Sequence, residues 1–155
     1  MLPLLAFALA AAPDAPPDPD RRDALARYGA ARLTAARGLP ARAAAGYEAA
    51  AKADPDSPEP LRPLVKLYAE LGRDAAAIRT ARQVLALDPA DADTAHHLGQ
   101  LLFDGKQYPA AVAALKQAAA SPRLVAPARR LGVARDLARA AEAGDDFATA
   151  EAALR

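Results

Sequence analysis

The chain has 155 residues, of which 53% are hydrophobic but only 5% aromatic, and it carries 20 Lys+Arg against 19 Asp+Glu with no Cys. The length suits one domain, and a net charge of +1 gives none of the long-range positive field that nucleic-acid binders display. Without cysteine there are no disulfides, thiolate zinc sites or cysteine nucleophiles. Because much of the apolar content is alanine, the elements of the fold must approach one another closely.

An uncharged apolar run, MLPLLAFALAAA, occupies residues 1–12. At about a dozen residues it is shorter than the ~20 that span a membrane, and it has the length of the hydrophobic region of a signal peptide. Ala8, Ala10 and Ala12 supply the A-x-A spacing of a cleavage site. The pattern favours a periplasmic or secreted protein whose mature chain has no membrane span. The alternative is an apolar helix packed on the domain, which would leave the protein cytoplasmic.

Residues 13–22 follow as a segment rich in proline and aspartate, with four prolines and three aspartates between Pro13 and Asp20. Proline lacks the backbone donor that helices and sheets require, and it also restrains the residue before it. We therefore expect an extended linker over residues 13–22.

The rest of the chain repeats with a period of thirty-four residues. Asp54-Pro55 recurs as Asp88-Pro89, and Gly38 recurs as Gly72. A third copy follows in register, and a fourth, marked by Gly144 and Ala150, comes after about five inserted residues. Such self-similarity is the signature of a repeat architecture.

Each copy contains two stretches in which apolar residues recur three and four positions apart, which predicts two helices. In the second copy these residues are Leu61, Leu64, Val65 and Tyr68, then Ala77, Ala81, Val84 and Leu85. The spacing predicts that Gly72 ends the first helix in a left-handed conformation and that Asp74 caps the second. Pro58, Pro60 and Pro63 predict that the first helix begins late, near Leu61.

These residues resemble the tetratricopeptide repeat, or TPR, which has characteristic large, small and aromatic residues at fixed positions of a thirty-four-residue unit. The second copy matches it at Leu61, Leu64, Val65, Tyr68, Ala77, Ala81, Val84 and Pro89, whereas the first helix of the first copy fits poorly, with Arg27 and Thr34 where bulk is expected. The resemblance implies an all-α, right-handed superhelical α-solenoid over residues 23–155, with about three and a half to four units at 24–57, 58–91, 92–124 and 125–155. An irregular helical bundle is the alternative.

Small residues at fixed positions of each unit should let neighbouring helices approach closely. The aromatic residues Tyr47, Tyr68, Tyr108 and Phe147 are expected to fill the remaining gaps as packing residues and not as ligand contacts. Since a short helix pair cannot bury an apolar face alone, stability must come from stacking neighbouring units.

The resemblance also implies a concave groove lined by the first helix of each unit. Its positions here are Tyr28, Arg32, Arg62, Lys66, His96, Gln100, Phe103, Arg135 and Arg139, with the acidic residues Glu70, Asp93, Asp104 and Glu142 among them. Arginine binds carboxylates with two parallel hydrogen bonds, so an acidic peptide is the expected ligand. The alternative is that arginine reflects composition alone. TPR proteins that clamp chaperone tails use Lys and Asn, and this chain has no Asn, so that specificity is not expected.

No pattern indicates catalysis. The sequence has no G-x-S-x-G motif, and its glycines are dispersed and do not form a phosphate-binding loop. His96 and His97 are adjacent and point about 100° apart on a helix, so they cannot chelate one metal ion from the same face. We expect neither enzyme activity nor a cofactor or metal.

The sequence thus predicts a protein-interaction scaffold that binds a partner protein or peptide in its groove, in the bacterial cell envelope. The alternative is a small oligomerising component of an envelope assembly, which would self-associate through an uncapped carboxyl-terminal edge. Nucleic-acid binding is not expected, and a steep salt dependence in a shift assay would revive it.

Overall fold

The computed structural model describes residues 19–154, which form eight α-helices and no strand. The helices are α1 (Pro19–Ala36), α2 (Pro40–Ala53), α3 (Leu61–Glu70), α4 (Asp74–Leu87), α5 (Ala92–Asp104), α6 (Tyr108–Ala120), α7 (Pro127–Ala143) and α8 (Phe147–Ala153). The helix α3 begins at Leu61, as the prolines before it predict.

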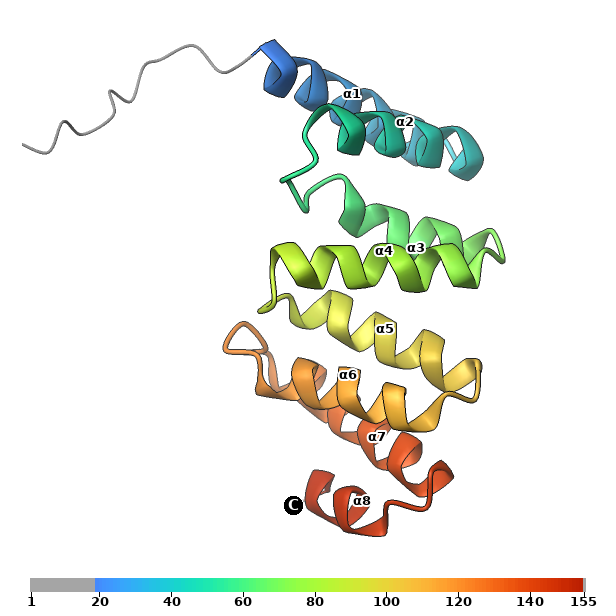
Figure 1. Cartoon of the computed structure of the whole chain (residues 1–155), viewed down its shortest axis with the longest axis vertical. Helices are drawn as coiled ribbons and strands as arrows, with labels where there is room; N and C mark the ends of the chain where they lie inside the picture. Colours follow the sequence, from blue (N-terminus) through green and yellow to red (C-terminus); the bar gives the residue numbers. More distant parts are fainter. Residues whose placement is uncertain (1–18, 155) are drawn as a thin grey trace, which may run out of the picture.

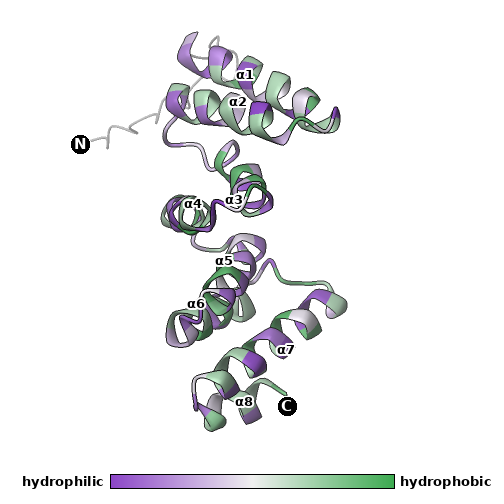
Figure 2. Cartoon of the chain, turned by 90° about the vertical axis from the view of Figure 1, so that its right-hand side faces the viewer, coloured by the Kyte–Doolittle hydropathy of each residue, from purple (hydrophilic) through white to green (hydrophobic). Residues whose placement is uncertain are grey.

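Consecutive helices pair as α1/α2, α3/α4, α5/α6 and α7/α8, and the four pairs stack along one axis (Figure 1). Seen from the side, α3 and α4 lie nearly end-on while α1 and α7 are seen more from the side, so the helix axes turn along the stack (Figure 2). The expectation of an all-α solenoid is confirmed.

The first helix is longer than the sequence analysis predicts. It begins at Pro19, so residues 19–22 are helical where a linker was expected. Proline is well tolerated at the first position of a helix, where its missing donor would be unpaired in any case. Asp20 in the first turn also interacts favourably with the helix dipole. The leader at 1–12 and the rest of the expected linker lie outside the described residues.

The turn inside each helix pair contains one residue in the left-handed conformation, at the same place in the repeat. In the first two pairs this residue is glycine, with φ of 71° at Gly38 and 68° at Gly72. In the last two it is Lys106 (φ 56°) and Asp145 (φ 60°), each one position after a glycine. The left-handed conformation predicted for Gly72 therefore recurs at one position of the repeat, whichever residue type occupies it.

The predicted capping role of Asp74 is wrong. The residue before α4 is Arg73, which makes no side-chain cap, and Asp74 is already the first helical residue. At that position its carboxylate still interacts favourably with the positive end of the helix dipole. Side-chain caps do occur at two other helices, where Asp91 accepts from the backbone N–H of Thr94 (3.0 Å) and Asp146 from that of Thr149 (3.1 Å).

Small residues bring the helices together at recurring positions. Ala43, Ala77, Ala111 and Ala150 occupy one repeat position, and all four are buried. In the third unit, a Cβ placed on Gly99 would lie 2.5 Å from Cγ of Leu115, so only glycine leaves room for that side chain. The contact between α5 and α6 therefore depends on the absence of a side chain at this position.

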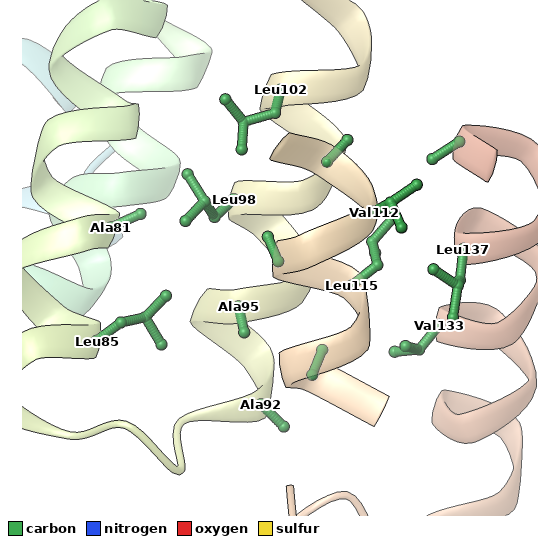
Figure 3. Packing of buried hydrophobic residues seen from close by; sticks show 14 of the residues in the cluster. Ala81, Leu85, Ala92, Ala95, Leu98, Leu102, Val112, Leu115, Val133 and Leu137 are labelled. Atoms are coloured by element: carbon green, nitrogen blue, oxygen red, sulfur yellow. The ribbon is translucent and has the colours of Figure 1, made fainter. Parts of the chain in front are cut away.

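The buried apolar residues form two clusters. The larger extends from α3 to α8 and includes Leu98, Leu102 and Leu115 (Figure 3). The smaller joins α1 and α2 to Leu64 of α3 and includes Tyr47.

Three of the four aromatic residues expected to pack do so, and the fourth does not. Tyr47 is buried, and Tyr68 and Tyr108 are half-buried. Phe147 is 67% exposed at the start of α8, so its predicted packing role is wrong. Among the described helices, only α7 approaches α8 within 8 Å between Cα atoms, and Lys116 of α6 reaches α8 by a hydrogen bond to the hydroxyl of Thr149 (2.9 Å). The side of α8 that carries Phe147 is left uncovered.

Candidate functional site

The first helices of the units form the inner side of the stack. Residues of α3 and α5, and of α5 and α7, approach within 8 Å between Cα atoms, whereas the second helices α2, α4, α6 and α8 do not approach one another in this way. The side on which neighbours lie closer together is the concave side. The first helices therefore line a concave face from α3 to α7.

A cavity of about 220 Å³ opens between α5, α6 and α7. Leu115 contributes an apolar side chain to it, Gly99 contributes backbone without a side chain, and Phe103 adds an aromatic ring. The remaining lining is polar and comes from two helices: Gln100 and Asp104 of α5, and Asp136 and Arg139 of α7. The cavity therefore brings together four predicted groove residues: Gln100, Phe103, Asp104 and Arg139.

Asp136 organises the polar side of this cavity. Its Oδ2 accepts hydrogen bonds from Nε2 of His96 (2.7 Å) and from the side-chain amide of Gln100 (2.9 Å). Because an ionised carboxylate only accepts, Nε2 of His96 carries the proton. Burial raises the pKa of Asp136, but hydrogen bonds from His96 and Gln100 and the nearby Arg139 outweigh it, and the net pKa is lowered. Asp136 is thus ionised at neutral pH.

Asp136 is the functional candidate that the sequence analysis missed. It stands one position after the predicted groove residue Arg135, at a repeat position that the TPR pattern does not assign to the groove. His97, at the equivalent position of α5, lies close enough to Lys66 of α3 for the two to interact electrostatically. In both α5 and α7 this repeat position therefore faces the first helix of the preceding unit, and no motif in the sequence signals it.

Arg139 and Phe103 form a stacked pair beside Asp136. The guanidinium carbon of Arg139 lies 4.8 Å from the centroid of the Phe103 ring, within the range of a cation–π interaction. The same ring contacts Tyr108, with 5.6 Å between ring centroids. An Nη atom of Arg139 lies 4.0 Å from Oδ1 of Asp136, too far for a hydrogen bond. Phe103 and Arg139 therefore hold each other in place.

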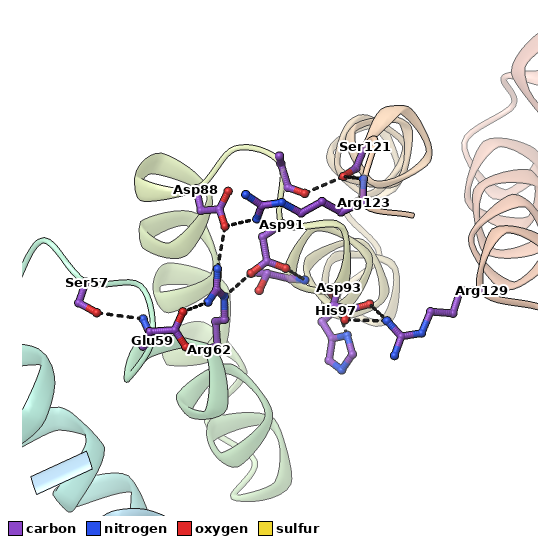
Figure 4. Close-up of polar contacts among 12 residues, drawn as sticks. Ser57, Glu59, Arg62, Asp88, Asp91, Asp93, His97, Ser121, Arg123 and Arg129 are labelled. Atoms are coloured by element: carbon purple, nitrogen blue, oxygen red, sulfur yellow. Dashed lines mark hydrogen bonds and ion pairs between the residues drawn. The ribbon is translucent and has the colours of Figure 1, made fainter. Parts of the chain in front are cut away.

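Arg62 does not face the groove as a free cation. It donates hydrogen bonds to Asp88 (2.7 Å), to Asp91 (2.6 Å) and to Glu59, and Asp88 also accepts from Arg123 (2.5 Å) (Figure 4). Burial lowers the pKa of Arg62, but its hydrogen bonds to Asp91 and Glu59 outweigh this and leave it raised. The pKa of Asp88 is lowered, chiefly by its hydrogen bond from Arg123. These contacts link the second unit to the third, which is a structural role.

The other predicted groove residues do not join the cavity. Lys66 is exposed and lines a separate hollow with Arg62 and Arg129, and Arg135 is exposed on α7. In the first unit, Arg32 lies 6.0 Å from the ring centroid of Tyr28, which itself packs on Tyr47 at 5.6 Å. The structure thus brings His96, Gln100, Phe103 and Arg139 together around Asp136, and it leaves Tyr28, Arg32, Arg62, Lys66 and Arg135 apart.

The acidic residues of the predicted groove differ in their partners. Asp93 is paired with Arg129 through both carboxylate oxygens, at 2.8 Å and 2.9 Å. Asp104 lines the cavity, and no hydrogen bond or ion pair forms at its side chain within residues 19–154. The histidines are separately engaged: His96 with Asp136, and Nδ1 of His97 with the backbone carbonyl of Asp93 (2.9 Å). Burial lowers the pKa of His97.

Comparison with known proteins identifies the fold. No protein-family model and no curated protein matches the chain. Among solved structures, it resembles MamA (TM-score 0.70, 24% identity, covering 79% of this chain and 69% of MamA) and PilF of Pseudomonas aeruginosa (0.68, 20%, 88% and 60%). It also resembles the first TPR of Spaghetti (RPAP3), bound to the HSP90 peptide SRMEEVD (0.70, 16%, 81% and 95%).

These likenesses establish a TPR fold. Nothing beyond the fold is taken from them, because identities below 25% carry information about architecture alone. Within residues 19–154 no helix is both long and apolar enough to cross a membrane.

Proposed function

We propose that this chain, which has the fold of a tetratricopeptide repeat array, is a scaffold that holds a segment of a partner protein on its concave face. The observation that carries the proposal is the cavity between α5, α6 and α7. Gln100 and Arg139 are exposed beside it and Phe103 is half-buried, and none of these three belongs to the set of buried core residues. Their exposed surfaces can contact a ligand without disturbing the buried core.

The solved structures support the same class of function. The first TPR of RPAP3 was solved with an HSP90 peptide bound, which shows that an array of this architecture can hold a peptide. The proposal extends only this mode of binding to the present chain and not the identity of the peptide. It assigns no catalysis and requires no cofactor, since the proposed work is done by surface complementarity.

Site-specific photocrosslinking in the producing cells tests the concave face. A photoreactive amino acid is placed on the concave side at Gln100 or Arg135 and, as matched controls, at Gln83 or Lys116 on the second helices, all of which are exposed. We expect partner adducts from the concave positions and none from the controls. Adducts confined to Gln83 and Lys116 would contradict the proposal and place the partner on the opposite face.

We also propose that the scaffold works in the cell envelope of a bacterium. The support is the apolar run at residues 1–12 with its A-x-A spacing. Mass spectrometry of the protein from fractionated cells tests this. Export predicts an envelope or secreted form that begins after Ala10 or Ala12, whereas an intact cytoplasmic form would refute it.

A second candidate function is self-association through the ends of the stack. Exposed apolar side chains lie at both ends, with Leu25 (65% exposed) and Leu33 (64%) on α1 and Phe147 (67%) and Leu154 (63%) at α8. Light scattering of the purified protein distinguishes the two candidates. A dimer or higher oligomer that dissociates in a Phe147→Ser variant would favour self-association, and a concentration-independent monomer would eliminate it.

A further inference from the structure

The cavity between α5, α6 and α7 has a charge opposite to the one that the sequence predicts for the groove. Two carboxylates line it, Asp104 and Asp136, against the single guanidinium of Arg139. The other basic side chains of the predicted groove lie elsewhere, and Arg62 is engaged by three carboxylates at the junction between units. An acidic ligand entering this cavity would therefore meet like charge on two sides.

The acceptors in the cavity are only partly used. On Asp136, Oδ2 accepts from His96 and Gln100, whereas within the described residues Oδ1 accepts no hydrogen bond and has only Arg139 nearby, with an Nη atom at 4.0 Å. The carboxylate of Asp104 has no partner within residues 19–154. Open carboxylate oxygens facing a cavity are suited to the N–H donors of an ammonium or guanidinium group.

The single basic group of the cavity already has a partner. Arg139 stacks on Phe103 at 4.8 Å, and this contact directs its guanidinium onto the aromatic face. The ring and the stacked guanidinium form one wall, while Leu115 and the bare backbone of Gly99 form an apolar floor. A side chain with an aliphatic stem and a charged end would place its stem on this floor and its charge at the carboxylates.

The size of the cavity points to one side chain and not to a whole small molecule. At about 220 Å³ it is smaller than the about 300–1,000 Å³ typical of small-molecule sites. Resting on the proposed scaffold function, we infer that the cavity is a specificity pocket for a lysine or arginine side chain of the bound partner segment. Asp104 and Asp136 receive the positive charge, and Gly99, Phe103 and Leu115 contact the aliphatic stem.

Nuclear magnetic resonance titration of the full-length, ¹⁵N-labelled protein tests the pocket with defined probes. The probes are three blocked pentapeptides with lysine, glutamate or leucine in the middle of four alanines. We expect the lysine peptide to shift the backbone amide signals of Gly99, Phe103 and Asp104 in a saturable manner, and the other two peptides to leave them unchanged.

Two charge variants and one control sharpen the test. Asp104→Asn should weaken the binding of the lysine peptide by about threefold to fivefold, which is the effect of one exposed ion pair. Arg139→Gln should strengthen it, because it removes the only positive charge that lines the cavity. Glu70→Gln is the matched control, since Glu70 is exposed at the same repeat position of α3 and lies outside the cavity, and it should leave the affinity unchanged.

The outcomes separate this inference from the function on which it rests. Preferential binding of the glutamate peptide at these amides, or weakening by Arg139→Gln, overturns the cationic pocket and leaves the scaffold function intact. Absence of any shift at these amides, while Gln100 still crosslinks to a partner in cells, also overturns the pocket alone. Loss of crosslinking from the concave positions removes the scaffold function itself.

Discussion

The first helix pair and the three that follow share the same turn and the same small residues, yet their first helices are held differently. At three inward repeat positions, α1 has Arg27, Ala30 and Thr34, where α3 has Leu61, Leu64 and Tyr68. In α1 the polar groups satisfy one another locally: Arg27 donates to Asp23 (2.7 Å), and the hydroxyl of Thr34 donates to the carbonyl of Ala30 (2.8 Å).

The consequence is that α1 approaches α2 but not α3 within 8 Å between Cα atoms, whereas α3 approaches α5 and α5 approaches α7 in this way. The first pair therefore attaches through α2 and the small cluster around Tyr47 and Leu64, and the large cluster holds the other three pairs together. In a stacked array, each unit is only as stable as its own pair plus the interface with its neighbour. The comparison teaches that matching turns do not guarantee matching interfaces.

The largest expected effect on stability comes from truncating a buried side chain of the large cluster. Leu115→Ala removes a side chain that is 1% exposed, and it should reduce the free energy of unfolding by about 2–5 kcal/mol. Chemical denaturation followed by circular dichroism measures this. Leu33→Ala on α1, at 64% exposure, is the control and should change stability by about 0.5 kcal/mol or less.

Hydrogen exchange on the same variant locates the effect. If the two clusters are separate, Leu115→Ala should accelerate exchange in α5 to α7 more than in α1 and α2. Equal acceleration in all helices would show that the first pair is as tightly coupled as the others.

The close approach of α5 and α6 gives the next largest effect. Gly99→Ala places a Cβ within 2.5 Å of Cγ of Leu115, and the resulting overpacking should cost about 1–3 kcal/mol. Gly132→Ala on α7 is the matched control, because a Cβ there meets no atom within 4 Å. It should stabilise the protein by about 1 kcal/mol through helix propensity. Thermal melting of both variants checks the opposite signs.

The turns provide a smaller effect of predictable sign. Lys106→Gly relieves a left-handed conformation in a non-glycine residue and should stabilise the protein by about 0.5–1 kcal/mol after glycine's entropy cost. Gly72→Ala imposes the same strain in the second unit and should destabilise it by a similar amount. If both variants melted at the wild-type temperature, the left-handed position would carry no strain.

The smallest expected effect concerns the junction between the first and second units. The hydroxyl of Tyr68 donates to a carboxylate oxygen of Glu48 (2.6 Å), which links α3 to α2. Burial and this hydrogen bond raise the pKa of Tyr68 from 10.0 to about 12. Because the folded state favours the neutral phenol, this contribution to stability is present below pH 10 and is lost as pH rises from 10 to about 12.

Denaturation of wild type and Tyr68→Phe across this pH range measures the difference. The wild type should lose stability relative to Tyr68→Phe as the pH rises above 10. Parallel curves for the two proteins would show that the link between the first and second units does not depend on the protonation of this phenol.

The sequence predicted the helix pairs, the turn positions and most buried small residues, because these depend on spacing within one unit. Polar partners proved harder to predict. His96 and Asp136 are 40 residues apart, and Asp88 and Arg123 are 35 apart, so their contacts depend on how one unit rotates against the next. The expected cap at Asp74 failed for a related reason, since one residue's shift in a helix start decides which side chain can reach the free N–H groups.

The recurring alanines have a consequence for how such a chain changes over evolutionary time. Because Ala43, Ala77, Ala111 and Ala150 occupy equivalent buried places, exchanging one unit for another by recombination preserves the small residue that each second helix presents. Duplication or loss of a whole unit then leaves no void and causes no steric overlap at this position. The length of the molecule can therefore vary between descendants while its cross-section is conserved.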